Sequence, residues 1–170
     1  MKPTEIDTDA THILAADHRA VEALFEEFEK ASGSDRKAKI ADRICTEIKI
    51  HAQIEEEVFY PALKGKIDDD LLKEAYVEHD GAKILINDIM ASSPDDEFFD
   101  AKVKVLSEEI KHHVHEEEAR SEGMFSQARE TGMDMVALRD EMLARKHELL
   151  AQAKAEALPQ AELRVVQARP

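Results

Sequence analysis

The stretches "IKIHAQIEE" (residues 48–56) and "IKHHVHEEE" (residues 110–118) are two copies of one pattern. Each begins with Ile-Lys and contains a histidine followed four residues later by a glutamate, His51 with Glu55 and His113 with Glu117. Residues i and i+4 lie on the same face of an α-helix. Each pair can therefore hold one ion together, or two neighbouring ions.

The composition of the whole chain favours long helices. The 170 residues include only five glycines and five prolines, while the helix formers Ala, Leu, Glu and Lys are abundant. Turn residues and apolar periodicity predict helices at about residues 9–30, 35–60, 68–91, 95–130 and 133–156. Four long helices with short connections form an up-down-up-down bundle by default. We therefore predict an all-α fold, with a four-helix bundle in residues 1–132, an additional C-terminal helix in 133–158 and a flexible tail in 159–170.

Each of the first four helices carries an apolar stripe that is interrupted by a histidine. In the first helix, steps of three and four residues lead from Leu14 to His18 and on to Val21. The same steps along the other helices place five more polar residues on the stripes: His51, Glu55, His79, His113 and Glu117. Burying such groups without partners would cost on the order of several kcal/mol for each charge. Something inside the bundle must offset that cost.

The spacing of these histidines reveals an internal repeat. His18 and His79 are 61 positions apart, and His51 and His113 are 62 positions apart. In both "ADHRAVEALFEEF" (16–28) and "VEHDGAKILINDI" (77–89), an acid precedes the histidine and apolar residues follow it. The chain thus consists of two similar helical hairpins. A pseudo-two-fold arrangement of the hairpins would bring all six polar side chains to one level of the bundle.

Six such side chains at one level point to bound cations. A single buried histidine is commonly hydrogen-bonded structure, but four in register across a repeat favour metal ligands. Imidazole and carboxylate without thiolate suit iron, manganese or zinc, and two bridging carboxylates flanked by histidines favour a pair of irons. The chain has no His-Glu-x-x-His motif and no calcium loop, and its one Glu-x-x-His pair, Glu109 with His112, faces away from the core. Four histidines lie off the stripes and are expected to be solvated: His12, His112, His115 and His147.

At these residues the sequence resembles the hemerythrin-like family of HHE cation-binding domains. The resemblance covers about residues 10–130 and rests on "DHRAVEALFEEF" (17–28), "HAQIEEEVFYPAL" (51–63), "EAYVEHDGAKILI" (74–86) and "HHVHEEEARSEGMF" (112–125). It implies a non-haem di-iron centre inside a hemerythrin-like bundle. By this resemblance His18 and His51 would hold one iron and His79 and His113 the other. Glu55 and Glu117 would bridge the two irons.

Two departures from the oxygen-carrying hemerythrins change what the resemblance implies. The carriers have a second histidine one turn before the position of His79, where this chain has Ala75. A coordination position would therefore be open to water or substrate. The carriers also place an aspartate five residues after the last histidine, whereas here Glu117 stands at plus four and Glu118 at plus five. Either glutamate could be the ligand, and we expect redox chemistry rather than reversible oxygen carriage.

Charge and cysteine content exclude several classes of partner and cofactor. The net charge is −15, so nucleic acid and anionic membranes are disfavoured by repulsion. The single cysteine, Cys45, excludes a disulfide or a thiolate-held cluster within the chain.

The first residues lack the apolar core of a signal peptide, and no run reaches transmembrane length. We therefore expect a cytoplasmic protein.

Three functions stay open on the sequence alone. The first is a di-iron protein of oxidative stress that binds or reacts with O₂ or peroxide, with catalase-like peroxide decomposition as the candidate enzyme activity. The second is a module that stores or senses iron, oxygen or nitric oxide without turnover. The third is a structural helical protein without metal. The C-terminal helix, which resembles the extension of some bacterial family members, has its own apolar stripe and would pack on the bundle or form a homodimer.

Overall fold

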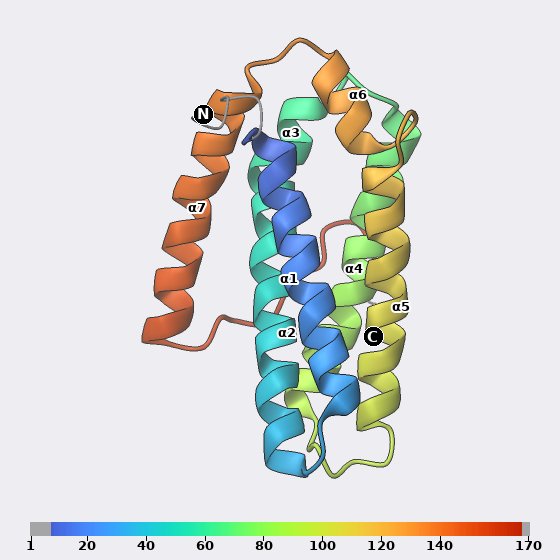
Figure 1. Cartoon of the computed structure of the whole chain (residues 1–170), viewed down its shortest axis with the longest axis vertical. Helices are drawn as coiled ribbons and strands as arrows, with labels where there is room; N and C mark the ends of the chain where they lie inside the picture. Colours follow the sequence, from blue (N-terminus) through green and yellow to red (C-terminus); the bar gives the residue numbers. More distant parts are fainter. Residues whose placement is uncertain (1–7, 168–170) are drawn as a thin grey trace, which may run out of the picture.

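The computed structural model describes residues 8–167 and is all-helical over that range. Figure 1 shows the long helices of the bundle side by side, with the C-terminal helix and the tail outside them. The elements in chain order are α1 (Ala10–Lys30), α2 (Ser34–Ile54), the π-helical turn η2 (Glu55–Phe59), α3 (Tyr60–Leu63), α4 (Asp69–Ala91), α5 (Phe99–Glu118), α6 (Met124–Glu130) and α7 (Met135–Ala155). The bundle consists of two helical hairpins, α1 with α2 and α4 with α5.

Aspartate side chains fix the starts of three helices. Asp9 accepts hydrogen bonds from two backbone N–H groups in the first turn of α1, and Asp68 and Asp134 do the same for α4 and α7. These caps satisfy donors that have no partner within the helix. Between α1 and α2 the chain turns at Gly33, whose φ of 88° is easily reached only without a Cβ.

The second helix changes to a π turn at the paired glutamates Glu55 and Glu56. The sequence predicts a break or kink of the second helix at Pro61, and the structure has the π turn η2 before this proline and a single α turn, α3, that contains it. The π turn adds one residue to the helical turn, so that the Tyr60 N–H bonds to the Glu55 carbonyl.

The prediction of one continuous fourth helix over residues 95–130 is wrong. Helix α5 ends at Glu118, and α6 starts only at Met124. A Cβ on Gly123 would lie 2.5 Å from the Ala119 carbonyl oxygen, so the tight turn between the helices requires glycine. The turn brings Phe125 over the ring of His18, with centroids 5.8 Å apart and ring planes nearly parallel.

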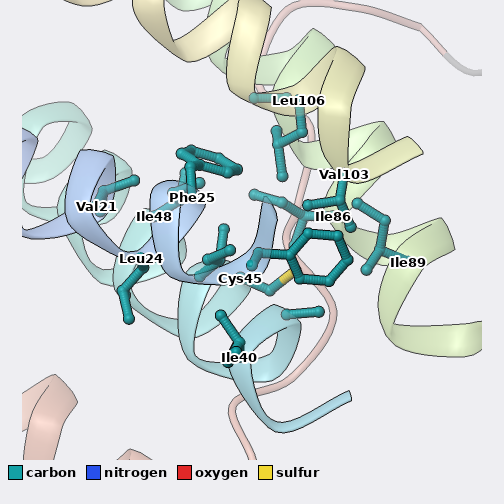
Figure 2. Packing of buried hydrophobic residues seen from close by; sticks show 14 of the residues in the cluster. Val21, Leu24, Phe25, Ile40, Cys45, Ile48, Ile86, Ile89, Val103 and Leu106 are labelled. Carbon is teal, nitrogen blue, oxygen red and sulfur yellow. The ribbon is translucent and has the colours of Figure 1, made fainter. Parts of the chain in front are cut away.

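Two apolar clusters divide the interior of the bundle. One cluster lies at the C-terminal half of α1 and includes residues of all four bundle helices. Figure 2 shows side chains of this cluster, such as Phe25, Ile48, Ile86 and Leu106, pointing toward one another. The second cluster contains Leu14 together with residues of α3, α6 and α7. The histidines of the stripes lie along the helices between the residues of these two clusters. The polar layer is therefore enclosed by apolar packing on both sides.

Helix α7 packs against the bundle of its own chain, beside α1 and α2 (Figure 1). Its residues Leu138, Met142 and Leu149 are buried there, so the stripe that the sequence offered either to the bundle or to a second copy is covered within the chain. The following tail, which we expected to be flexible, runs back across the bundle and makes several hydrogen bonds to it. None of the described helices combines the length and the apolar character needed to cross a membrane.

Candidate metal centre

The structure brings all six side chains of the apolar stripes together in one buried layer. None of the six residues exposes more than 8% of its surface: His18, His51, Glu55, His79, His113 and Glu117. They come from four different helices and from η2. Such a concentration of imidazole and carboxylate in an apolar interior is costly unless the groups satisfy one another or hold cations.

The four imidazoles form two pairs. The Nε2 atoms of His18 and His51 lie 3.1 Å apart, and those of His79 and His113 lie 3.2 Å apart. Each pair joins the two helices of one hairpin. The pairing is the one that the family resemblance implied for two separate ions.

Each of the two glutamates reaches both histidine pairs. Glu55 Oε2 lies 3.2 Å from His51 Nε2 and 3.2 Å from His79 Nε2. The two oxygens of Glu117 lie 3.3 Å from His18 Nε2 and 3.4 Å from His113 Nε2. Both carboxylates therefore lie between the histidine pairs, where each can bridge two ions.

A second layer of four carboxylates surrounds the imidazoles. Each histidine donates its Nδ1–H to one acid: His18 to Glu118 at 2.7 Å, His51 to Asp17 at 3.4 Å, His79 to Glu56 at 3.0 Å and His113 to Glu78 at 2.6 Å. Such a bond fixes the ring orientation and leaves the Nε2 lone pair free for a cation. The two candidate acids of the fourth helix also differ in position. Glu117 faces the Nε2 atoms of His18 and His113, whereas Glu118 accepts the Nδ1–H on the other side of the His18 ring.

Sequence reasoning missed this second layer, although its signal was visible. Asp17 and Glu78 are the acids that precede the first histidine of each repeat, and Glu56 and Glu118 follow the two bridging candidates directly. These acids bind a histidine on a neighbouring helix and not the one beside them in the sequence: Asp17 of α1 binds His51 of α2, and Glu78 of α4 binds His113 of α5. Which helix supplies the partner depends on how the helices pack, which no local sequence pattern encodes.

Tyr60 is a further polar residue of the centre. Its hydroxyl donates to Glu117 Oε1 at 3.0 Å and lies 3.2 Å from His79 Nε2. Burial and the nearby charges of Glu117 and Glu55 raise the pKa of the phenol well above its ordinary value of 10.0. The hydroxyl therefore keeps its proton and acts as a hydrogen-bond donor beside the His79–His113 pair.

Two observations show that the donor set fits cations. When the imidazoles are neutral with the proton on Nδ1, the facing Nε2 atoms of each histidine pair direct lone pairs at one another across about 3 Å, which a cation or an added proton must relieve. In addition, Glu55 Oε1 and Glu117 Oε2 are buried, and no hydrogen-bond donor among residues 8–167 satisfies them. Nitrogen and carboxylate donors without thiolate suit iron, manganese or zinc. Two groups of residues can each hold one ion, and Glu55 belongs to both: His18, His51, Glu55 and Glu117 form the first, and Glu55, His79 and His113 the second.

In the metal-free centre, the neighbouring carboxylates favour protonation of two of the imidazoles, those of His51 and His113. Burial alone would lower the pKa of His51, but the charges of Glu55 and Asp17 raise it to about 10. The pKa of His113 is likewise raised well above its ordinary value, against burial, by Glu117 and Glu78. Burial opposes the charge of Glu117, but His113 and His18 hold the pKa of that carboxyl well below its usual range. A cation entering the site must therefore displace protons.

A small apolar cavity adjoins the centre. The four histidines border it, and its other walls include the side chains of Val21, Ile48, Ala82, Ile86, Ile110 and Val114. Small, weakly polar molecules are the species that such walls admit. The histidines that the sequence placed off the stripes, His12, His112, His115 and His147, are all exposed, as predicted.

The chain resembles known proteins in sequence and in fold. The profile of the family described as "Hemerythrin HHE cation binding domain" matches residues 9–125. A protein of Nostoc sp. named "DNA nickase" is 28% identical over 113 residues, which are 66% of this chain but only 32% of that protein. The crystal structure of a hemerythrin HHE cation binding domain-containing protein from Mycobacterium kansasii superposes with a TM-score of 0.73 at 19% identity, covering 89% of this chain and 95% of that one.

Proposed function

The chain belongs to the family of hemerythrin HHE cation-binding domains, and we propose that it is a non-haem di-iron protein that binds or reacts with O₂ or peroxide. One iron would be held by His18 and His51 and the other by His79 and His113. Glu55 and Glu117 would bridge them. The observation that supports this most strongly is the position of Glu55 Oε2, 3.2 Å from one imidazole of each pair.

Two irons held side by side would supply up to two electrons to a small oxidant. The protein's own residues prepare the site for such a reaction. The second-layer acids orient the imidazoles, and the apolar cavity admits small molecules while limiting the escape of reactive products. The Tyr60 hydroxyl remains a neutral hydrogen-bond donor at the site, because burial and the charges of Glu117 and Glu55 keep its pKa high.

Iron loading tests the proposal. Protein loaded anaerobically with iron(II) and then exposed to air should hold about two irons per chain and develop near-ultraviolet bands of bridged iron(III). The variant His51→Ala should lose at least one iron, while His147→Ala, which changes an exposed histidine, should keep both. Iron-loaded protein without bridged-iron bands, or full iron content in His51→Ala, would overturn the assignment.

Peroxide turnover distinguishes an enzyme from a storage or sensing module. Sustained oxygen evolution from peroxide by the loaded protein would support a catalase-like activity. A single turnover or none would favour the module that stores or senses iron, oxygen or nitric oxide. We do not propose DNA nicking for this chain, because it spans about a third of the relative with that name and its net charge of −15 opposes the approach of phosphates.

A further inference from the structure

Each second-layer carboxylate is itself held by a cationic side chain or by a further histidine. Arg19 donates to Glu118 at 2.8 Å, and His112 lies 3.3 Å from Glu78. These two partners lie within the family domain, on the bundle helices. The partners of the other two acids, Asp17 and Glu56, include residues far beyond position 125, where the family match ends.

Helix α7 supplies the partner of Asp17. The Lys146 ammonium forms an ion pair with Asp17 Oδ1, while Asp17 Oδ2 faces His51 Nδ1 at 3.4 Å. Both side chains of the ion pair are largely covered, at 18% and 14% exposure. Because α7 is packed by the buried residues Leu138, Met142 and Leu149, Lys146 is presented to Asp17 from a fixed support.

The tail supplies a partner of Glu56. Arg164 Nε donates to Glu56 Oε2 at 3.0 Å, and Glu56 Oε1 accepts from Lys83 at 2.6 Å and faces His79 Nδ1 at 3.0 Å. The Glu56 side chain is only 2% exposed, so its charge depends on these partners. Arg164 therefore contacts the acid that binds His79, just as Lys146 contacts the acid that binds His51.

The tail is anchored on both sides of this contact. The buried carboxylate of Asp80 accepts the backbone N–H groups of Arg164, Val165 and Val166 at 2.7–3.0 Å. Asn87 makes two hydrogen bonds of 2.9 Å to the backbone of Ala161. Earlier in the tail, Lys49 donates to the carbonyl of Leu158 at 3.1 Å.

We propose that the C-terminal extension is a working part of the metal centre, in which Lys146 and Arg164 are positioning residues for the two halves. They hold Asp17 and Glu56 charged and oriented, and these acids orient His51 and His79. Lys146 acts on the half that contains His18 and His51, and Arg164 acts on the half that contains His79 and His113. This inference rests on the proposed function for its metal, but the contacts themselves exist in the metal-free protein.

The physical effect expected is on metal retention. An acid that accepts the Nδ1–H raises the basicity of a ligand imidazole, and loss of such partners weakens metal binding by about 10- to 100-fold. Lys146 and Arg164 contact the acids and not the imidazoles, so they lie one polar contact farther from the metal. Glu56 also keeps Lys83 as a second partner when Arg164 is replaced. We therefore expect roughly a threefold to tenfold faster release of one iron in each variant.

The test uses the full chain with Lys146→Gln and Arg164→Gln, the conservative variants Lys146→Arg and Arg164→Lys, and Arg145→Gln as control. Arg145 lies next to Lys146 and pairs with Glu57 at 2.6 Å, so its removal costs an ion pair of α7 that includes neither Asp17 nor Glu56. Iron release to a chelator and the Mössbauer spectrum of the loaded protein are measured. Each Gln variant should accelerate one release phase and alter one of two iron signals, a different one in each. The conservative variants should restore wild-type behaviour.

Release and spectra that match those of Arg145→Gln would overturn the inference, as would identical changes in both Gln variants. Failure of the proposed function gives a different result, since the wild-type protein would then hold no iron. Hydrogen exchange of the metal-free protein provides the second readout. Asp80→Asn should lose the protection of the Arg164, Val165 and Val166 amides, and unchanged protection would show that the tail is not anchored as inferred.

Discussion

The substitution Glu55→Gln tests the role assigned to the carboxylate between the two histidine pairs. Glu55 is fully buried, and its Oε2 lies within 3.2 Å of both His51 Nε2 and His79 Nε2. An amide of the same shape keeps the packing but removes the anionic ligand from both ions at once. The substitution therefore perturbs metal binding with little change in volume.

The magnitude follows from the ligand count. Loss of an outer-layer partner costs up to about 100-fold in metal affinity, so loss of a direct ligand should cost at least about 100-fold for each ion. Each factor of 100 corresponds to about 2.7 kcal/mol of metal-linked stability at saturating metal. Two ions together give about 5 kcal/mol, or a decrease in Tm of about 10–20 °C for a chain of this size.

The assay is thermal unfolding followed by circular dichroism, with and without anaerobic iron(II). Glu57→Gln is the matched control, because Glu57 is two positions away and forms an ion pair at the surface with Arg145, where about 0–1 kcal/mol is expected. Without metal the loss of the His51 ion pair and the relief of repulsion between Glu55 and Glu117 oppose each other. The metal-free Tm should therefore change less than the loaded one. An unchanged iron-dependent rise in Tm would refute the bridging role.

Three further perturbations give distinct results. Tyr60→Phe removes the hydroxyl that donates to Glu117 at 3.0 Å and should cost the metal-free protein about 1–3 kcal/mol in urea unfolding; equal stability would mean that this hydrogen bond contributes nothing. The metal-free protein should lose stability as the pH rises from 6.5 toward 10, because folded His51, with its pKa raised from 6.5 to about 10, retains a proton that the unfolded chain releases. A flat profile over that range would contradict the assigned ion pairs, and the iron-loaded protein should show the opposite trend because metal binding needs a deprotonated imidazole. Glu117→Gln should lower the iron content, whereas Glu118→Gln should keep two irons and release one of them faster; equal iron loss in both would contradict the distinction between ligand and orienting acid.

The sequence predicts the bundle well because its helices follow local rules. Apolar periodicity sets the helix faces, and the polar residues that interrupt it, such as His18 and His79, lie in the buried layer that the periodicity indicates. The start of α4 at the acidic run 68–70 follows from capping, and Asp68 indeed caps the helix. These features depend on residues within a few turns of one another.

The features that the sequence did not predict depend on contacts between distant segments. At Pro61 the sequence predicts a break or kink but not the π form of the preceding turn, and it does not predict the break after Glu118. The tail has a loop-like composition, yet Asp80 and Asn87 hold it through backbone hydrogen bonds from more than 70 residues away in the sequence. Pairing of this kind depends on tertiary packing, which periodicity does not reveal.

The most direct test of the central claim is anomalous diffraction at the iron edge from crystals of protein purified without added metal. We predict two peaks inside the bundle, one between His18 and His51 and one between His79 and His113, with the carboxylates of Glu55 and Glu117 between the peaks. A single peak, no peak, or iron bound away from these six side chains would contradict the claim.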